Sequence, residues 1–423
     1  MNHLDLVNRK KLSTFEAFSL SFGGQAPFTS IITFGTIGLQ IGGNFLTIAT
    51  IIGTVIVLIN GLVIYKLSLK FAQQGGYFTY AFYSLTERLG LITGWVFILY
   101  AFSYGGTLLA GSIYIISSYI KMQFLTYDIF TLIIIAVSAS LIIRGLEVST
   151  KYAEFISIAE ILAIIISSVV LLAKSQHLAS VLSMPLQPFL VILYAIGMPI
   201  GYGNLNPMSE EIRNARRMVG LITVLVILLG GLLSALLFYA VSPYGTDLIG
   251  VLKHNVGFIF PYLIFSALNG GILGGIAYII SMSRIVYAMS IKKFLPLIFS
   301  AFSNNRPFNA EIFSLITYSI FLFLFIHFYG IYDTFLFLGG LTVLSYLTIS
   351  ISASFSLFRI SVKKLWKRKG SVTLALLSAI LSGAILVFSM QESSPIINYV
   401  FLGWIIIGFI YTELLEMISK EKN

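Results

Sequence analysis

The sequence predicts an all-α polytopic membrane protein of about twelve spanning helices, built as two inverted five-helix repeats followed by two extra helices. Three observations lead to this prediction: the composition, the number of long apolar stretches, and polar breaks in two of those stretches. The chain of 423 residues is 58% hydrophobic and only 10% charged, whereas roughly a quarter of the residues of a soluble protein are charged. We therefore expect one transmembrane domain that takes up the whole chain.

Twelve apolar stretches are long enough to cross a bilayer, which takes about 17–25 residues in a helix. Five belong to a first repeat at about 14–173, five to a second at about 188–357, and two follow at about 371–416. Ser13 and Glu16 form a capping-box pattern that marks the start of the first stretch. The predicted spans are 14–39, 44–66, 89–118, 126–143, 151–173, 188–208, 217–241, 256–289, 311–328, 332–357, 371–390 and 396–416.

The distribution of basic residues predicts the orientation of the chain. If the N-terminus is cytoplasmic, 22 of the 26 Lys and Arg residues fall on the cytoplasmic side and Arg284 lies within the eighth span. Because loops rich in Lys and Arg stay inside, we expect a multi-pass protein of the cell membrane with both termini in the cytoplasm. The basic group at 359–369 faces the anionic inner leaflet, so the net charge of +10 indicates contact with membrane lipids and not with nucleic acid. The three basic residues on the outer side are Lys121, Lys174 and Lys253.

Residues that usually perform catalysis or bind metals are scarce. The chain has no cysteine, which excludes disulfide bonds, thiolate metal sites and cysteine nucleophiles. Its four histidines fall in tails, loops and span ends without the spacing of metal ligands. A membrane-embedded enzyme would need clustered His, Asp and Glu near one interface, and a sensor would need a soluble output domain. The sequence shows neither pattern, so we expect no enzyme, no metal and no cofactor other than a coupling ion, H⁺ or Na⁺.

Two of the predicted spans are interrupted by residues that a spanning helix usually avoids. The first span contains Gly23-Gly24-Gln25-Ala26-Pro27, and the sixth contains Pro199-Ile200-Gly201-Tyr202-Gly203-Asn204. In hydrocarbon, backbone that leaves the helix is tolerated only where it is buried in protein or lines a water-filled cavity. The two helices are five spans apart, so they run in opposite directions and both breaks lie near the middle of the bilayer. Such paired breaks predict a transport site.

Broken helices offer the groups that bind a zwitterion. Free N–H groups at a half-helix N-terminus bind a carboxylate, and free carbonyls at a half-helix C-terminus bind an ammonium group. We predict that the amides of residues 23–25 bind the substrate carboxylate and that carbonyls of residues 200–204 accept its amine. Tyr104 of the third span and Tyr202 are candidates for the cavity wall. A single Gly-Gly pair is more often a packing contact, but two breaks that combine Gly, Pro and a polar residue favour a binding site.

Glu160 is the clearest acidic residue deep within a predicted span. It lies roughly nine residues into the fifth span, among apolar residues with Ser157 and Ala159 close in sequence. A lone carboxylate is costly to ionise at this depth, and such groups are often functional. Two roles are open: Glu160 carries a coupling proton, or it is a carboxyl group hydrogen-bonded to a neighbouring helix for packing.

Charged residues near the cytoplasmic ends of the sixth and eighth spans form a second group. Arg284 lies within two turns of the end of its span, where we expect it to pair with an acid or a helix C-terminus. Glu210 and Glu211 come just before Arg213 in the loop after the sixth span. These residues are expected to form an ion network that serves as an inner gate or as a structural link.

Four short motifs follow one another along the chain. They are Gly75-Gly76-Tyr77-Phe78-Thr79-Tyr80, then Gly94-Trp95, then Ser209-Glu210-Glu211-Ile212-Arg213-Asn214-Ala215-Arg216-Arg217, and finally Ser283-Arg284-Ile285-Val286-Tyr287-Ala288-Met289 with Leu295-Pro296. They are similar to the patterns Gly-Gly-x-Tyr-x-Tyr, Gly-Trp, Glu-Glu-x-x-Asn-Pro-x-Arg and Ser-Arg-x-x-Tyr-Ala-Met…Leu-Pro. With these motifs the chain resembles the amino acid–polyamine–organocation (APC) superfamily of permeases along nearly its whole length.

The resemblance implies a leucine-transporter-type fold, with the 5+5 inverted repeat, and secondary transport of amino acids or related amines by alternating access. It also implies that the unwound segments 23–27 and 199–204 hold the substrate backbone. Glu160 matches a position at which some proton-coupled relatives carry a lysine in place of a sodium ion. The chain departs from the family pattern in the sixth span, where Gly-Phe-Glu reads Gly201-Tyr202-Gly203, and in the first break, where Gln25 and Pro27 replace Gly-Ser-Gly.

The leading interpretation is a proton-coupled amino acid permease that binds a small-molecule substrate. The alternative within transport is a sodium-coupled or exchanging carrier of amines or polyamines. A polyamine site would need several acidic residues deep within the predicted spans. The sequence places only Glu160 there, which counts against polyamines. A non-transporting amino acid sensor and a membrane enzyme are the remaining, weaker alternatives.

Overall fold

The computed structural model describes residues 11–119, 124–175, 182–303, 306–363, 366 and 368–421. Within these ranges the chain is helical, and the only strand-like pairings are two isolated bridges, Leu12–Ile212 and Ser303–Arg306. The prediction of an all-α protein is confirmed. Lys121, and Lys364 and Lys367 of the basic group at 359–369, lie outside the described residues.

Ten helices in the described part of the chain are long and apolar enough to cross a membrane. Each coincides with one of the predicted spans, so the chain is a polytopic membrane protein. The other two predicted spans are the two with breaks, and the total of twelve stays a prediction. The ten helices are α4 (Phe45–Ser68), α6 (Glu87–Tyr119), α7 (Phe124–Arg144), α8 (Leu146–Lys174), α10 (Ala215–Val241), α12 (Phe260–Ile291), α13 (Phe308–Tyr329), α14 (Ile331–Val362), α15 (Lys369–Glu392) and α16 (Pro395–Glu421).

Each span with a break is a series of shorter helical pieces. Proline opens α2 and η2, and a proline without an N–H is favoured at the first position of a helix. The first span consists of α1 (Thr14–Gln25), α2 (Pro27–Ser30), a π-helical turn η1 (Ile31–Gly35) and α3 (Thr36–Gly42). The sixth consists of α9 (Pro188–Gly197) and the 3₁₀ helices η2 (Pro199–Asn204) and η3 (Asn206–Glu211).

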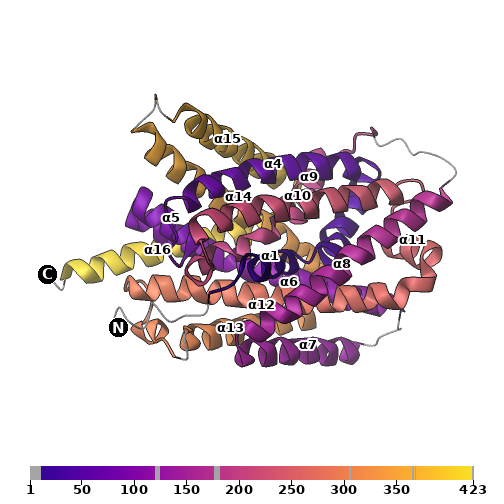
Figure 1. Cartoon of the computed structure of the whole chain (residues 1–423), viewed down its shortest axis with the longest axis horizontal. Helices are drawn as coiled ribbons and strands as arrows, with labels where there is room; N and C mark the ends of the chain where they lie inside the picture. Colours follow the sequence, from indigo (N-terminus) through magenta and orange to yellow (C-terminus); the bar gives the residue numbers. More distant parts are fainter. Residues whose placement is uncertain are drawn as a thin grey trace.

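The long helices separate into a central and a peripheral set. In their most apolar windows, 89% of α6 and 78% of α12 and α14 are buried, against 22–33% of α7, α13, α15 and α16. Figure 1 shows α6 and α12 in the middle of the bundle, with α7 and α13 along one edge and α15 at the opposite edge. The spans with breaks pack against the central set, since α1 of the first span contacts α12 and α9 of the sixth contacts α14.

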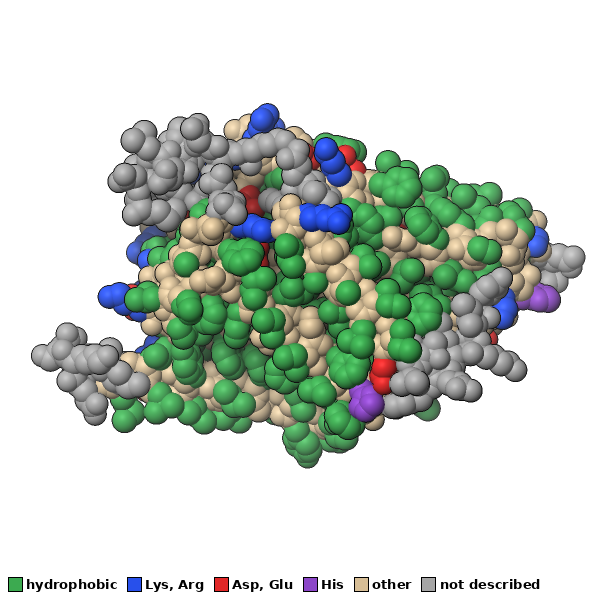
Figure 2. Space-filling model, turned by 90° about the horizontal axis from the view of Figure 1, so that it is seen from below, with side chains coloured by type: hydrophobic (Ala, Val, Ile, Leu, Met, Phe, Trp, Pro, Cys, Tyr) green, Lys and Arg blue, Asp and Glu red, His purple; other side chains and the backbone are tan. Residues whose placement is uncertain are grey.

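The surface of the bundle suits a lipid environment. Hydrophobic side chains cover most of the face in Figure 2, and charged side chains are sparse on it. Phe328, Ile380 and Ile406 on the peripheral helices are all more than half exposed. A soluble monomer rarely exposes apolar patches of this extent, so the peripheral helices present the face expected to contact acyl chains.

The short elements close the ends of the bundle. Gly75 and Gly76 have φ values of 91° and 41°, which favour glycine, and they start α5 (Gly76–Ser84). A Cβ on Gly76 would lie 2.7 Å from the carbonyl carbon of Asn206, so this turn packs directly on η3. The remaining short pieces are α11 (Leu248–Asn255), η4 (Gly257–Ile259) and η5 (Leu297–Ser300).

Candidate functional site

The break in the first span lies at Ala26. α1 is helical through Gln25, and Ala26 then has φ 45° and ψ 67°, in the left-handed region, before Pro27 opens α2. Each N–H of an α-helix donates to the carbonyl four residues earlier, so the amides of residues 23–25 belong to the hydrogen-bond ladder of α1. The break therefore follows the two glycines instead of coinciding with them.

The sixth span is irregular over a longer stretch. α9 ends at Gly197, and two successive 3₁₀ helices of six residues each follow. Runs of 3₁₀ helix beyond three or four residues are uncommon because their hydrogen bonds are poorly aligned. All six residues of η2 are nevertheless buried, so surrounding side chains must support this backbone.

The two breaks touch each other. A Cβ on Gly201 would lie 2.2 Å from Cα of Gln25, and a Cβ on Gly24 would lie 1.8 Å from Nδ2 of Asn204. No larger residue fits at either position without moving the backbone or the amide. The predicted segments 23–27 and 199–204, far apart in sequence, are thus in direct contact at these glycines.

Two side-chain amides also link the breaks to each other. Gln25 Nε2 donates to the carbonyl of Met198 over 3.0 Å, at the end of α9. Asn204 Nδ2 donates to the carbonyl of Leu20 over 3.2 Å, in α1. Each half of the site therefore satisfies a backbone carbonyl of the other half. Both amides are buried, and their oxygens, Gln25 Oε1 and Asn204 Oδ1, have no partner among the described residues.

Three tyrosine hydroxyls donate to backbone carbonyls at the breaks. Tyr100 and Tyr104 are four residues apart on α6 and so share one face of the helix, and Tyr278 is on α12. All three side chains are at most 1% exposed. The bonds are Tyr104 to Gln25 O (3.0 Å), Tyr100 to Ile200 O (2.7 Å) and Tyr278 to Gly201 O (2.9 Å).

Sequence reasoning singled out Tyr104 and Tyr202 and missed the other two. The four-residue spacing from Tyr104 was a signal that could have found Tyr100, but nothing distinguishes Tyr278 among 23 tyrosines. Tyr202 points elsewhere, since its hydroxyl lies 3.0 Å from that of Tyr346 on α14. Tyr346 in turn accepts a bond of 3.2 Å from Nδ2 of Asn60 on α4.

Glu160 on α8 lies beside the segment that follows the first break. Its Oε1 accepts a hydrogen bond of 2.8 Å from the hydroxyl of Thr29 and one of 3.4 Å from the Thr29 N–H. The side chain is fully buried, and Oε2 has no hydrogen-bond partner among the described residues. Gly270 on α12 makes room for it, because a Cβ there would lie 2.0 Å from Oε1.

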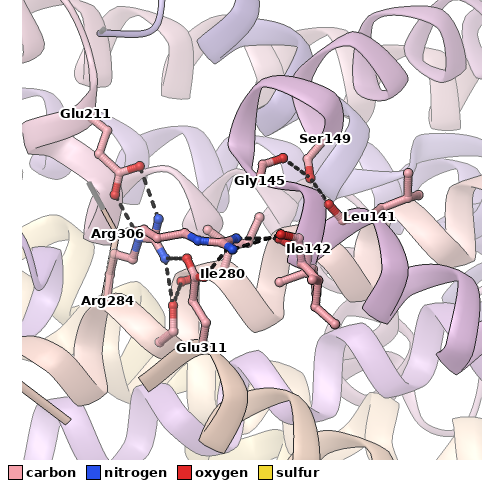
Figure 3. Close-up of polar contacts among 11 residues, drawn as sticks. Leu141, Ile142, Gly145, Ser149, Glu211, Ile280, Arg284, Arg306 and Glu311 are labelled. Carbon is pink, nitrogen blue, oxygen red and sulfur yellow. Dashed lines mark hydrogen bonds and ion pairs between the residues drawn. The ribbon is translucent and has the colours of Figure 1, made fainter. Parts of the chain in front are cut away.

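Arg284 is the centre of a buried ion network (Figure 3). Its Nε lies 2.7 Å from Glu211, and its Nη1 lies 2.5 Å from Glu311 on α13. Arg306 extends the network, 3.4 Å from the other oxygen of Glu311. Sequence reasoning missed Glu311 and Arg306, since neither lies in one of the motifs and only packing brings α13 to α12.

Arg306 also binds the end of a neighbouring helix. Its guanidinium donates to the carbonyls of Ile142 and Ile143, each over 2.8 Å, at the end of α7 (Figure 3). The last carbonyls of a helix lack partners within the helix, so a cation suits this position. The network thus joins α7, α12, α13 and η3 at the end of the sixth span.

Glu210 and Arg213 stay outside this network, since neither forms an ion pair with another residue that the structure describes. Glu210 lines two cavities, one of 780 Å³ with Lys11 and one of 350 Å³ with Gln74. The N–H of Arg213 donates to the Leu12 carbonyl over 3.0 Å. Of the residues predicted to form the inner gate, Glu211 and Arg284 therefore belong to the ion network, whereas Glu210 lines cavities beside it.

A backbone bridge fastens the start of the first span to the end of the sixth. The Leu12 N–H donates to the Glu211 carbonyl over 2.7 Å, and the bridge pairs Leu12 with Ile212. Glu211 is the acid that also binds Arg284 through its side chain. Glu211 therefore connects the ion network to the segment just before α1, at one end of the bundle.

Metal ligation finds no support in the described ranges, where no three His, Cys, Asp or Glu residues gather closely enough to hold an ion.

A family model described as amino acid permease matches residues 12–411, almost the whole chain. No curated protein matches the chain significantly.

Proposed function

The chain belongs to the amino acid permease family, and we propose that it carries amino acids across the cell membrane by alternating access. The observation that carries this proposal is the contact between the two breaks, where Gly201 meets Gln25 at a distance that no larger residue allows. Irregular backbone of this kind is tolerated in a membrane protein only where it is buried or lines a cavity. A substrate bound here would touch both spans.

The carbonyls of Gln25, Ile200 and Gly201 are the acceptors that we assign to the substrate amino group. A carboxylate needs N–H donors, and those of residues 23–25 are engaged within α1. Glycine is the weakest helix former after proline, costing about 1 kcal/mol relative to alanine. We therefore propose that the last turn of α1, with Gly23 and Gly24, unwinds to receive the carboxylate.

Glu160 is the group that we assign to proton coupling. It lies next to Thr29, three residues after the break at Ala26, so a change in its charge acts directly on this segment. Because Oε2 has no hydrogen-bond partner in the part of the chain that the structure describes, the ionised form is the more costly one to bury. Protonation from one side of the membrane and release to the other would then accompany each transport cycle.

The ion network around Arg284 is the proposed inner gate. It joins η3, the end of the sixth span, to α12 and α13 in this conformation, and the bridge from Leu12 to Ile212 closes the same end. Opening this end requires both sets of contacts to separate. The proposed orientation, with both termini in the cytoplasm, puts this gate on the cytoplasmic side.

The helix contacts support the proposed inverted repeat. α4 packs on α10 and α6 packs on α12, which pairs the second span with the seventh and the third with the eighth. α6 also contacts α14, and its counterpart α12 contacts α8. A two-fold relation between residues 14–173 and 188–357 accounts for each of these pairs.

A carrier of amines without a carboxylate is the second candidate. The tyrosine hydroxyls at the breaks donate to backbone carbonyls. Such carbonyls can also accept from an ammonium group, whether or not the substrate carries a carboxylate. Sodium-coupled transport or exchange would fit the same site.

The test is uptake by the purified protein in proteoliposomes. Each of the twenty standard L-amino acids is offered with a pH gradient, a sodium gradient or neither, and the corresponding decarboxylated amines serve as comparison. We expect amino acid uptake that the pH gradient drives and the sodium gradient does not. Uptake of the amines alone would favour the second candidate, and no uptake of either class would contradict a transport function.

A further inference from the structure

The carbonyls assigned to the substrate amino group are already occupied in this conformation. Tyr104 donates to Gln25 O, Tyr100 to Ile200 O and Tyr278 to Gly201 O, over 2.7–3.0 Å. Each donor is a side-chain hydroxyl from α6 or α12, outside the two spans with breaks. Three O–H groups thus stand where the three N–H groups of a primary ammonium group could bind.

The tyrosines also fill the space beside the breaks. The ring centroids of Tyr104 and Tyr278 are 4.7 Å apart, and those of Tyr100 and Tyr278 are 5.5 Å apart. A Cβ added to Gly201 would lie 2.6 Å from the Tyr104 hydroxyl. Because all three side chains are buried, an amino group can reach these carbonyls only if the hydroxyls withdraw.

We propose that Tyr100, Tyr104 and Tyr278 are internal competitors of the substrate amino group. Their hydroxyls hold the carbonyls of both breaks in the empty protein, and an ammonium group replaces them on binding. This inference rests on the proposed function, because it takes the breaks as the substrate site. The protein would then recognise the substrate chiefly by its amino group. The electron-rich faces of the displaced tyrosine rings add a cation–π contact to the ammonium group.

Removing one of these hydroxyls from the binding site should strengthen substrate binding, whereas the loss of a hydroxyl from a binding site usually weakens it. In the Tyr278→Phe protein the empty state leaves the buried Gly201 carbonyl without its donor, whereas the bound state supplies an N–H instead. Substrate binding should therefore become tighter, by about 5- to 140-fold, from the usual penalty for an unsatisfied buried acceptor. If the tyrosines instead bound the substrate directly, the same change would weaken binding.

The experiment measures amino acid binding to the full chain in detergent micelles by isothermal titration calorimetry. The probes are the standard L-amino acid that binds tightest and its des-amino carboxylic acid. Tyr278→Phe and Tyr104→Phe are each expected to bind the amino acid more tightly and the des-amino acid no more tightly than the unmodified protein. Either variant alone suffices if the other does not fold.

Tyr318→Phe is the matched control. Tyr318 on α13 is 2% exposed, and its hydroxyl has no partner among the described residues. This variant should bind the amino acid with unchanged affinity. Weaker or unchanged binding by both test variants would overturn the inference, as would an equal gain in Tyr318→Phe or for the des-amino acid.

A further variant separates this inference from the proposed function. Gly201→Val pushes a side chain into Gln25 and should abolish binding if the breaks are the site. If Gly201→Val abolishes binding while Tyr278→Phe and Tyr104→Phe both weaken it, the site stands and only the competitor role fails. If Gly201→Val binds normally, the proposed function fails, and the inference fails with it.

Discussion

Glu160 joins α8 to the segment after the first break through a single oxygen. Both of its bonds go to Thr29, and the other oxygen is buried without a partner among the described residues. A neutral carboxyl group is less costly to bury in this way than a carboxylate. Whether Glu160 is protonated therefore affects its hydrogen bonds to Thr29, and so the backbone close to Ala26.

Replacing Glu160 with glutamine should remove the dependence of uptake on a pH gradient while leaving substrate binding in place. Glutamine has the same shape and can still accept from Thr29, but it cannot release a proton. The measurement is proteoliposome uptake with and without an imposed pH gradient. Glu154→Gln, one and a half turns toward the start of α8, is the control and should keep the dependence. A Glu160→Gln protein that still follows the gradient would place coupling at another group.

Arg284 and Glu311 form the most deeply buried ion pair in the described ranges, with side chains 2% and 5% exposed. Arg284 and Arg306 share the Glu311 carboxylate, so its loss leaves a surplus positive charge in the buried network. Breaking a buried ion pair in this way costs about 3–5 kcal/mol. Glu311→Gln should therefore lower the melting temperature in detergent by several degrees. Glu413→Gln, in an exposed pair with Arg88, is the comparison and should have an effect below about 1 kcal/mol. Equal effects would contradict the central place of Glu311.

Between helices, a polar network joins α15 to the sixth-span break. Asn60 on α4 donates to Tyr346, which contacts Tyr202 of η2. The Asn60 Oδ1 accepts from Ser378 over 2.7 Å and from Ser382 over 3.2 Å, both on α15. A helix outside the two predicted repeats is thus linked to the proposed site through Asn60 and Tyr346.

Asn60→Leu should lower both stability and substrate affinity. Leucine is of similar size but removes the hydrogen bonds of Asn60 to Tyr346, Ser378 and Ser382, and a buried polar group left unsatisfied costs about 1–3 kcal/mol. Melting temperature and binding by calorimetry are measured on the same samples. Asn398→Leu breaks bonds only at the turn between α15 and α16, so it should change stability and leave affinity unchanged. If Asn60→Leu behaves like this control, the network is structural only.

The helices were predictable because each is a long apolar stretch, and the capping box at Ser13 and Glu16 is confirmed. The place of the first break was predictable to within a few residues from Gly23, Gly24 and Pro27. The left-handed residue itself is Ala26, whereas Gly24 allows the close approach of Asn204 and Gly23 that of Leu273. The bond from Tyr278 to Gly201 depends on how α12 packs against η2. The spacing of residues along the sequence does not show how such distant segments pack.

At the scale of the whole molecule, the orientation in the membrane is open to a simple test. The chain has no cysteine, so a single introduced cysteine is the only thiol. Ser394, between α15 and α16, and Ser303, between α12 and α13, are both exposed. In intact cells a membrane-impermeant maleimide should label Ser394→Cys, and should label Ser303→Cys only after the cells are opened. The reverse pattern would invert the proposed topology.

The central claim is that the two breaks together hold the substrate, and amino acid binding to Gly201→Val tests it most directly. The control is Gly403→Val on α16, where an added Cβ meets nothing within 4 Å. Both proteins should elute as folded species, and Gly201→Val should melt at a lower temperature because its side chain must displace the Gln25 backbone. We predict that Gly403→Val binds the amino acid like the unmodified protein and that Gly201→Val does not bind it. Normal binding by a folded Gly201→Val protein would contradict the claim.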